Sequence, residues 1–210
     1  MAALPLILYG CAQQTVSVDP VVRGGQMVAT PGKPGYVVGA PYGSSDAQTA
    51  AIATEIARRT GFGLVVASGA GIDAGGALTY ERRVREIAQG RLAFFVEILG
   101  NARRESAHRI EIATVGVDRE YAARLRTLLE LTRDAHLRGR PGTPRLAVLV
   151  EPADTLSSAG GASRREGLLP APARALHVEL PQVARTDARE LYVTILAEFL
   201  TQAATLPPGR

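Results

Sequence analysis

Residues 91–118 read RLAFFVEILGNARRESAHRIEIATVGVD, in which two apolar segments flank a polar, arginine-rich one. The apolar segments, 91–99 and 108–115, have the length and composition of buried strands. From Asp118 to about Leu137, apolar residues recur at helical spacing. Two strands followed by a long helix indicate a sheet that carries helices on its surface.

The same alternation extends along the rest of the chain. Further strands are predicted at 36–40, 64–67, 146–150 and 175–180, and further helices at 46–61, 80–88 and 188–203. We therefore expect a three-layer α/β fold with a mixed central sheet and helices on both faces, and we expect residues 69–76 to form a flexible loop.

The ligand cleft of such a sheet lies at the carboxyl ends of its strands. This rule selects the loops 41–46 and 100–106 and the residues around Glu179 as the candidate site. No phosphate-binding glycine motif follows a strand, so nucleotide binding has no support.

The length of 210 residues suits one domain, which we expect over residues 36–206. Residues 1–35 then form an extension, with irregular strands or the remnant of a signal peptide. Residues 1–10 are apolar but too short to span a bilayer. The segment Leu8-Tyr9-Gly10-Cys11 resembles a lipoprotein cleavage box only loosely, since Tyr9 is bulky; we expect a cytoplasmic protein, with an exported lipoprotein anchored at Cys11 as the alternative.

The composition excludes several classes of protein. The 210 residues include one cysteine and three histidines, which rules out an internal disulfide framework and leaves little material for a histidine-rich metal site. The 24 basic and 20 acidic residues are interleaved, and few aromatic residues lie beside the arginines, which disfavours nucleic-acid binding. The serines lie in no nucleophile elbow, so a serine hydrolase has no support. The sequence does not indicate an oligomeric state.

Four segments occur in an order typical of one family. They are GAPYGSSDAQTAAIATEIARRTGFGLVVASG (39–69), YERRVREIAQG (80–90), FFVEILGNARRESAHRIEIATVGVD (94–118) and ALHVELP (175–181). These segments resemble the N-formylglutamate amidohydrolase family and, more distantly, zinc carboxypeptidase-like hydrolases. The resemblance covers about residues 36–204 and implies a phosphorylase/hydrolase-like α/β fold, a zinc cofactor and cleavage of amide bonds in small carboxylate-bearing molecules or peptides.

The resemblance also shows where this chain departs from the family. The family holds zinc with a histidine after the first strand, a nearby acidic residue and a histidine at a later strand end. Here Tyr42 and Leu99 occupy the two histidine positions, and only Asp46 remains as a ligand. A leucine has no lone pair to donate, and a tyrosine phenol is a poor replacement for imidazole. The glycine-rich residues 71–76 also stand where the family grips a substrate carboxylate.

The resemblance implies that Glu179 is the general base that activates water. Arg109, whose guanidinium could bind a carboxylate bidentately, and Asn101 are the candidate substrate-binding residues. Each has a structural alternative: Glu179 as a paired strand carboxylate, and Arg109 as an ion-pair partner. An aspartate before an alanine-rich helix, such as Asp46, is more typical of a helix cap than of a metal ligand.

Three other side chains complete the candidates. His177 lies two residues before Glu179, so both side chains should face the same side of a strand. Glu97 and Glu111 lie on strands adjacent in sequence, where they could pair with each other or with nearby arginines. A new metal site built from Asp46, Glu97 and His177 is a further alternative.

Two functions follow as hypotheses. The chain either retains weak amide hydrolysis, or it is a non-catalytic homologue, a pseudoenzyme, that binds an acidic small molecule or a protein partner through the old cleft. The two substituted ligand positions, Tyr42 and Leu99, favour the second hypothesis.

Overall fold

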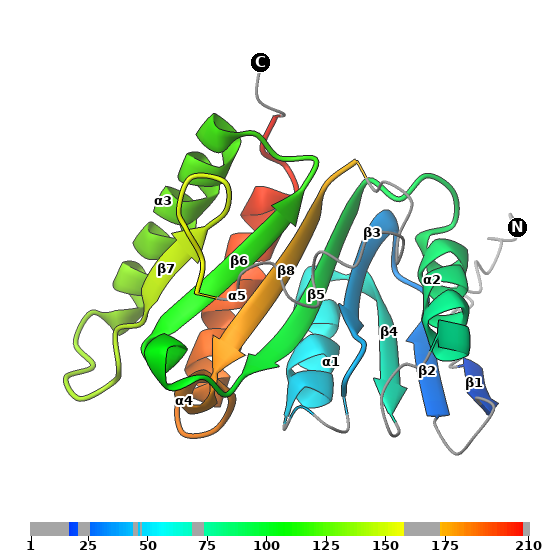
Figure 1. Ribbon diagram of the computed structural model, residues 1–210, viewed down its shortest axis with the longest axis horizontal. Coiled ribbons are helices and arrows are strands. Elements are labelled where there is room, and N and C mark those ends of the chain that lie inside the picture. The colour runs from blue at the N-terminus through cyan, green and yellow to red at the C-terminus, as the bar shows by residue number, and fades with distance from the viewer. Residues whose placement is uncertain are drawn as a thin grey trace, which may run out of the picture.

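The computed structural model describes residues 17–20, 26–43, 46, 48–68, 74–157 and 173–207. Its described strands form one mixed sheet, shown in Figure 1. The strands are β1 (Ser17–Pro20), β2 (Gln26–Thr30), β3 (Lys33–Ala40), β4 (Phe62–Ser68), β5 (Phe94–Asn101), β6 (Arg109–Val115), β7 (Ala147–Val150) and β8 (Ala175–Pro181). The helices are α1 (Thr49–Thr60), α2 (Ala74–Ala88), a 3-10 turn η1 (Arg104–Ser106), α3 (Arg119–Leu137), α4 (Gln182–Arg185) and α5 (Arg189–Ala203).

The strand order across the sheet is β1-β2-β4-β3-β5-β8-β6-β7. Strands β4, β3, β5 and β8 are parallel neighbours, so their carboxyl ends meet at one edge of the sheet. Strand β6 is antiparallel to β8, and its first residues therefore arrive at that same edge. Strand β8 comes late in the sequence, yet it lies between β5 and β6 in space (Figure 1).

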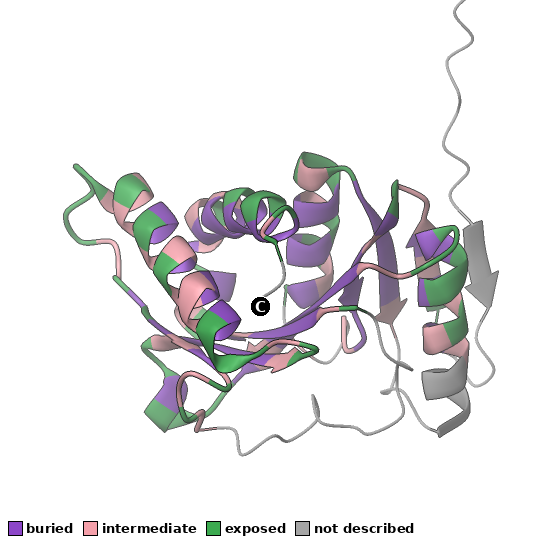
Figure 2. Cartoon of the chain, turned by 90° about the horizontal axis from the view of Figure 1, so that it is seen from above, coloured by how far each residue is buried: buried purple, intermediate pink, exposed green. Residues whose placement is uncertain are grey.

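Helices cover both faces of the sheet. Helices α1, α3 and α5 lie together on one face, and their buried sides turn toward the strands (Figure 2). Helix α2 packs against β2, β3 and β4 and has its core on the other face. The three-layer α/β fold expected from the sequence is therefore confirmed.

The two faces have separate apolar cores because side chains alternate along each strand. The core under α1, α3 and α5 includes Ile98, Ile112 and Phe199, each fully buried. The core under α2 includes Val65 and Phe95. None of the helices in the described part of the chain is long and apolar enough to cross a membrane.

Local differences from the sequence predictions have simple reasons. Helix α2 begins at Ala74, inside the stretch 69–76 that glycine content predicted to be a loop. Asp46 does not cap α1, because Gln48 precedes that helix in a left-handed conformation without a side-chain cap. Within residues 1–35, where irregular strands were one of the expectations, residues 26–35 supply β2 and the start of β3. Cys11 lies outside the described residues.

Candidate functional site

The candidate site lies where β3, β5 and β8 end side by side. In the register of β5 and β8, Gly100 lies opposite Leu180 and Asn101 lies opposite Pro181. The loop that starts at Pro41 follows β3, and the backbone N–H of Gly43 donates to the carbonyl of Ala67 at the end of β4. The loops selected from the sequence therefore meet at one edge, as expected for a parallel sheet.

Asp46 contacts the end of β5. Its Oδ2 accepts a hydrogen bond of 2.8 Å from the backbone N–H of Gly100. A Cβ atom on Gly100 would lie 3.1 Å from Cγ of Asp46 and 3.0 Å from Cζ of Arg185, so a larger residue here would have to displace one of these side chains. The Asp46 carboxylate thus has a structural role that joins the β3 loop to β5.

Arg185 is a functional candidate that the sequence analysis missed. It is 7% exposed although it carries a guanidinium group. Its Nε donates to the carbonyl of Leu180 at 3.1 Å, and its Nη2 donates to the carbonyl of Asn101 at 3.5 Å. A lone arginine after a strand carries no sequence signal; only the short helix α4, which was not predicted, brings it back over the ends of β5 and β8.

The two positions at which the resemblance implies histidines hold other side chains. Leu99 is 5% exposed and lies directly opposite Glu179 in the β5–β8 register, so one of these positions is apolar. Tyr42 is half-buried and has partners of its own. Within the described ranges, no group of three histidine, cysteine, aspartate or glutamate side chains could hold a metal ion. These residues do not fit a zinc ion.

The alternative metal site of Asp46, Glu97 and His177 is also wrong. A Cβ atom built on Gly100 would point toward Asp46, so Asp46 lies on the face of β5 that Gly100 shares with Ile98. Glu97 is an odd-numbered residue of the same strand and points to the opposite face. The sheet therefore separates Asp46 from the other two side chains.

Glu179 and Asn101 are in contact at the sheet edge. The Asn101 Nδ2 donates to Oε2 of Glu179 at 3.0 Å, while its Oδ1 accepts from the backbone N–H of Arg103 at 2.9 Å. Asn101 is 5% exposed. Its amide therefore bonds both to the Glu179 carboxylate and to the backbone of Arg103.

Arg109 lies at the start of β6, on the same edge and on the same face as Glu111. Its Nη1 donates to Oγ of Ser157 at 3.0 Å, and the side chain is half-buried. Glu111 lies opposite Glu179 across the antiparallel β6–β8 pair. The candidate residues Glu179, Asn101 and Arg109 therefore lie at one edge of the sheet.

The carboxylate pair suggested for Glu97 and Glu111 does not form, because β8 lies between their strands. Instead, Oε2 of Glu97 lies 2.7 Å from Nδ1 of His177, and Oε1 of Glu111 accepts from Oγ of Ser106 at 3.0 Å. His177 and Glu179 share a face, as predicted. Sequence spacing could not reveal these partners, because each pairing depends on where β8 inserts.

Tyr80 of α2 completes this face. Its hydroxyl is buried and makes no hydrogen bond to any residue that the structure describes. It approaches so closely to Gly39 that a Cβ there would lie 2.0 Å from the hydroxyl oxygen. Burial raises the pKa of Tyr80 well above its ordinary value, and the charge of the adjacent Glu97 raises it further. The phenol stays protonated.

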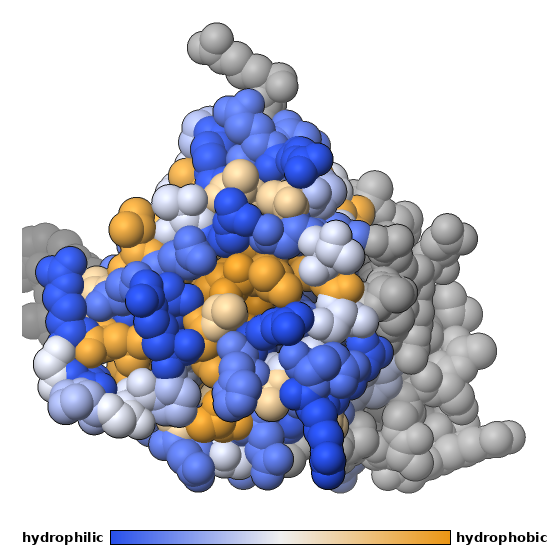
Figure 3. Space-filling model, turned by 60° about the vertical axis from the view of Figure 1, so that its left-hand side comes forward, coloured by the Kyte–Doolittle hydropathy of each residue, from blue (hydrophilic) through white to orange (hydrophobic). Residues whose placement is uncertain are grey.

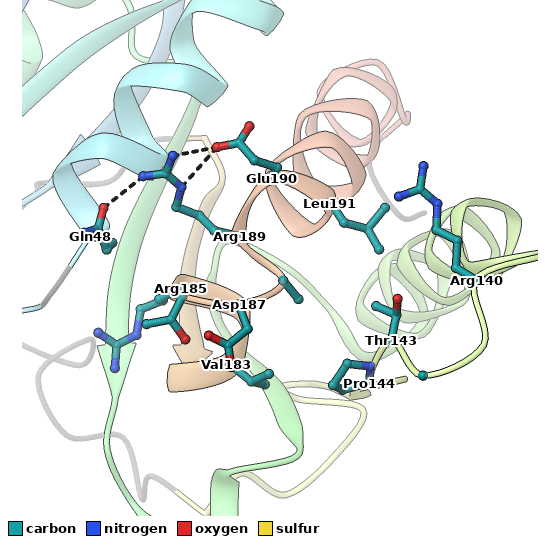
Figure 4. Close-up of a pocket in the computed structure, with 13 residues that line it drawn as sticks. Gln48, Arg140, Thr143, Pro144, Val183, Arg185, Asp187, Arg189, Glu190 and Leu191 are labelled. Carbon is teal, nitrogen blue, oxygen red and sulfur yellow. Dashed lines mark hydrogen bonds and ion pairs between the residues drawn. The ribbon is translucent and has the colours of Figure 1, made fainter.

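A cavity of about 720 Å³ adjoins the edge on the side of α4 and α5 (Figure 4). Three arginines line it: Arg140, Arg185 and Arg189. Arg189 is held by Oε1 of Gln48 at 3.0 Å and by Oε1 of Glu190 at 2.6 Å.

Figure 3 shows apolar side chains gathered on one face of the molecule and ringed by hydrophilic ones.

Two solved structures resemble this fold. A bacteriophage poly-γ-glutamate hydrolase matches with a TM-score of 0.54 and 12% identity, over 88% of this chain and 90% of that chain. The zinc-free apo form of YndL matches with a TM-score of 0.53 and 12% identity, over 86% of this chain and 91% of that chain. No family model and no curated protein sequence matches the chain. At identities this low, the two matches show a shared fold and nothing beyond it.

Proposed function

We propose that this chain is a degenerate member of the N-formylglutamate amidohydrolase-like hydrolases, whose cleft binds a carboxylate-bearing N-acyl amino acid or peptide without zinc-dependent hydrolysis. The observation that carries the proposal is the buried Leu99 opposite Glu179, in the place of a metal ligand. The bond from Gly100 to Asp46 supports it, because the one remaining ligand position is already occupied structurally.

Arg109 is the proposed carboxylate-binding residue. A guanidinium can bind a carboxylate through two parallel hydrogen bonds, and Arg109 is half-buried at the same edge as Glu179. The fold shared with a poly-γ-glutamate hydrolase, a protein named for a substrate rich in carboxylates, is consistent with this assignment.

The second candidate function is residual amide hydrolysis with Glu179 as the base. It is favoured by the contact from Asn101, which holds the Glu179 carboxylate at the sheet edge. In this hypothesis Glu179 would activate water, and Arg109 would orient the substrate.

Zinc stoichiometry tests the first part of the proposal. We expect no bound zinc in the natural chain and a gain of bound zinc in the double variant Tyr42→His/Leu99→His, because this variant returns imidazoles to the two positions at which the resemblance implies them. Leu131→His is the matched control, since Leu131 is 64% exposed on α3 and adds a histidine away from the cleft. Near one zinc in the natural chain would overturn the degenerate assignment.

Calorimetric titration with N-acetylglutamate tests the binding. Arg109→Gln should weaken the affinity about tenfold, because the neutral amide loses a bidentate charged contact. Unchanged affinity would remove Arg109 from the binding site. Zinc-free hydrolysis of N-acyl amino acids that Glu179→Gln abolishes would favour the second candidate function instead.

A further inference from the structure

Glu97 and His177 form a buried pair that the resemblance does not use. They are direct partners in the register of β5 and β8, and their side chains meet on the face opposite α1, α3 and α5. Oε2 of Glu97 lies 2.7 Å from Nδ1 of His177, with the residues 5% and 8% exposed. Both groups lie on strands within the sheet, so their geometry is fixed by the backbone register.

The hydrogen bond assigns a tautomer to His177. The Glu97 carboxylate accepts a hydrogen bond from Nδ1–H, so the neutral ring carries its proton on Nδ1 and leaves Nε2 unprotonated. No residue in the described part of the chain bonds to Nε2. Nε2 is also not one of the fully buried atoms without a partner, so it keeps some exposure. His177 therefore presents an accepting nitrogen to the surface of the sheet face.

Other polar groups lie near the pair. The Tyr80 hydroxyl lies beside Gly39, which is the β3 partner of Glu97 in the sheet register, and burial raises the pKa of Tyr80 well above its ordinary value. Glu179 lies two residues from His177 on the same strand face, so the imidazole adjoins the edge at which the proposed function places the substrate. A low-dielectric setting strengthens the interaction between the carboxylate and an imidazolium that forms transiently.

We propose that His177 is the general base of a metal-independent esterase activity, with Glu97 as its positioning residue. Nε2 takes a proton from a water molecule while the water oxygen bonds to the acyl carbon of an ester. The bond between that carbon and the leaving oxygen then breaks, and the imidazolium returns its proton to the departing alcohol. The products are a carboxylic acid and an alcohol. The location of the substrate rests on the proposed function; the chemistry at His177 does not.

Hydrolysis of p-nitrophenyl acetate in the presence of a metal chelator tests the proposal. His177→Gln should lower kcat/KM about 100-fold, the usual contribution of a positioned general base. Glu97→Gln should lower it less, since the imidazole remains, and the double variant should match His177→Gln. Far-UV circular dichroism and urea unfolding establish that each variant is folded.

His136→Gln is the matched control. His136 also lies 2.7 Å from a glutamate, Glu198, but on the helical surface, so its loss should leave the rate within about twofold. Equal rates for His177→Gln, His136→Gln and the natural chain would overturn the proposal. So would a wild-type rate no greater than that of the same concentration of free imidazole.

The natural chain provides a readout that needs no variant. A general base gives a solvent deuterium isotope effect, because a proton moves in the rate-limiting step. A burst of p-nitrophenol without an isotope effect would indicate acylation of the imidazole and would overturn the general-base role. Calorimetric binding of N-acetylglutamate is measured separately, so failure of the esterase and failure of the proposed binding function are distinguishable.

Discussion

The two faces of the sheet are built from the same strands but hold different kinds of side chains. In β5, Ile98 packs under the helices while its neighbour Glu97 points to the opposite face; in β8, Val178 and His177 divide in the same way. The first face is a continuous apolar core under α1, α3 and α5. The second is apolar under α2 and polar beyond it. The first face therefore contributes mainly apolar packing, and the second combines an apolar core under α2 with buried polar groups.

The largest effect is expected from Phe199 in the apolar face. Phe199→Ala should lower the free energy of unfolding by about 3–5 kcal/mol, because the fully buried ring leaves a cavity that the packed helices cannot fill. Urea unfolding measures the change. Leu131→Ala, at an exposed leucine of the same helix layer, is the control and should change the free energy by less than about 0.5 kcal/mol. A loss below 1 kcal/mol at Phe199, as an order-of-magnitude limit, would contradict this view of the core.

Two buried tyrosines sharpen the comparison because they should respond with opposite signs. Tyr192 lies in the apolar face, where its hydroxyl donates to the carbonyl of Pro144 at 2.5 Å and accepts from the N–H of Leu146 at 3.1 Å. Tyr192→Phe should therefore destabilise the fold by about 1–3 kcal/mol. Tyr80→Phe removes a buried hydroxyl without a described partner and should stabilise the fold by about 1 kcal/mol.

Chemical denaturation of both tyrosine variants in one buffer provides the test. A loss of stability in Tyr80→Phe comparable to that in Tyr192→Phe would mean that the Tyr80 hydroxyl has a bonded partner. The adjacent Glu97 would then be the first candidate for that partner.

The smallest effect concerns a carboxylate outside both faces. Glu55 on α1 accepts from Nη2 of Arg58 and Nε of Arg59, each at 2.6 Å. The hydrogen bond from Arg58, and then that from Arg59, lowers the Glu55 pKa from its ordinary value of 4.5 to about 2. Because the pKa is lower in the folded state, this stabilisation is complete above the ordinary value and is lost as the pH falls toward 2.

Glu55→Gln should therefore lower the melting temperature at pH 7 and have no effect near pH 2. The group is partly exposed and screened by solvent, so the difference at pH 7 should be at most about 1 kcal/mol, or about 3 °C. Melting curves of the two proteins across this range give the answer; an equal difference at both pH values would show that charge is not responsible.

The sequence predicted the fold well wherever periodicity was strong. The helix expected from Asp118 to Leu137 is α3, and the Asp118 side chain caps it by accepting from the N–H of Tyr121. The error at α2 arose from Gly75 and Gly76, which lower helix propensity but lie here in the first turn, where intrinsic propensity is a weak guide.

The site was predicted only in part. Alternation along one strand correctly placed His177 and Glu179 on one face. It could not give their partners, because Glu97 and Asn101 come from a strand distant in sequence. Asp46 illustrates the same limit: its residue type suits a cap, but the end of β5 supplies a backbone N–H that binds it instead.

The late position of β8 in the chain has a consequence for biosynthesis. Strands β5 and β6 leave the ribosome well before residues 175–181, and both pair with β8 along their length. Until then, each exposes an apolar, hydrogen-bonding edge that can associate with another chain. Pairings between distant segments also form slowly. A nascent chain arrested before β8 therefore lacks the centre of its sheet, where stability and proton-transfer groups converge, and it is the species we expect chaperones to bind longest.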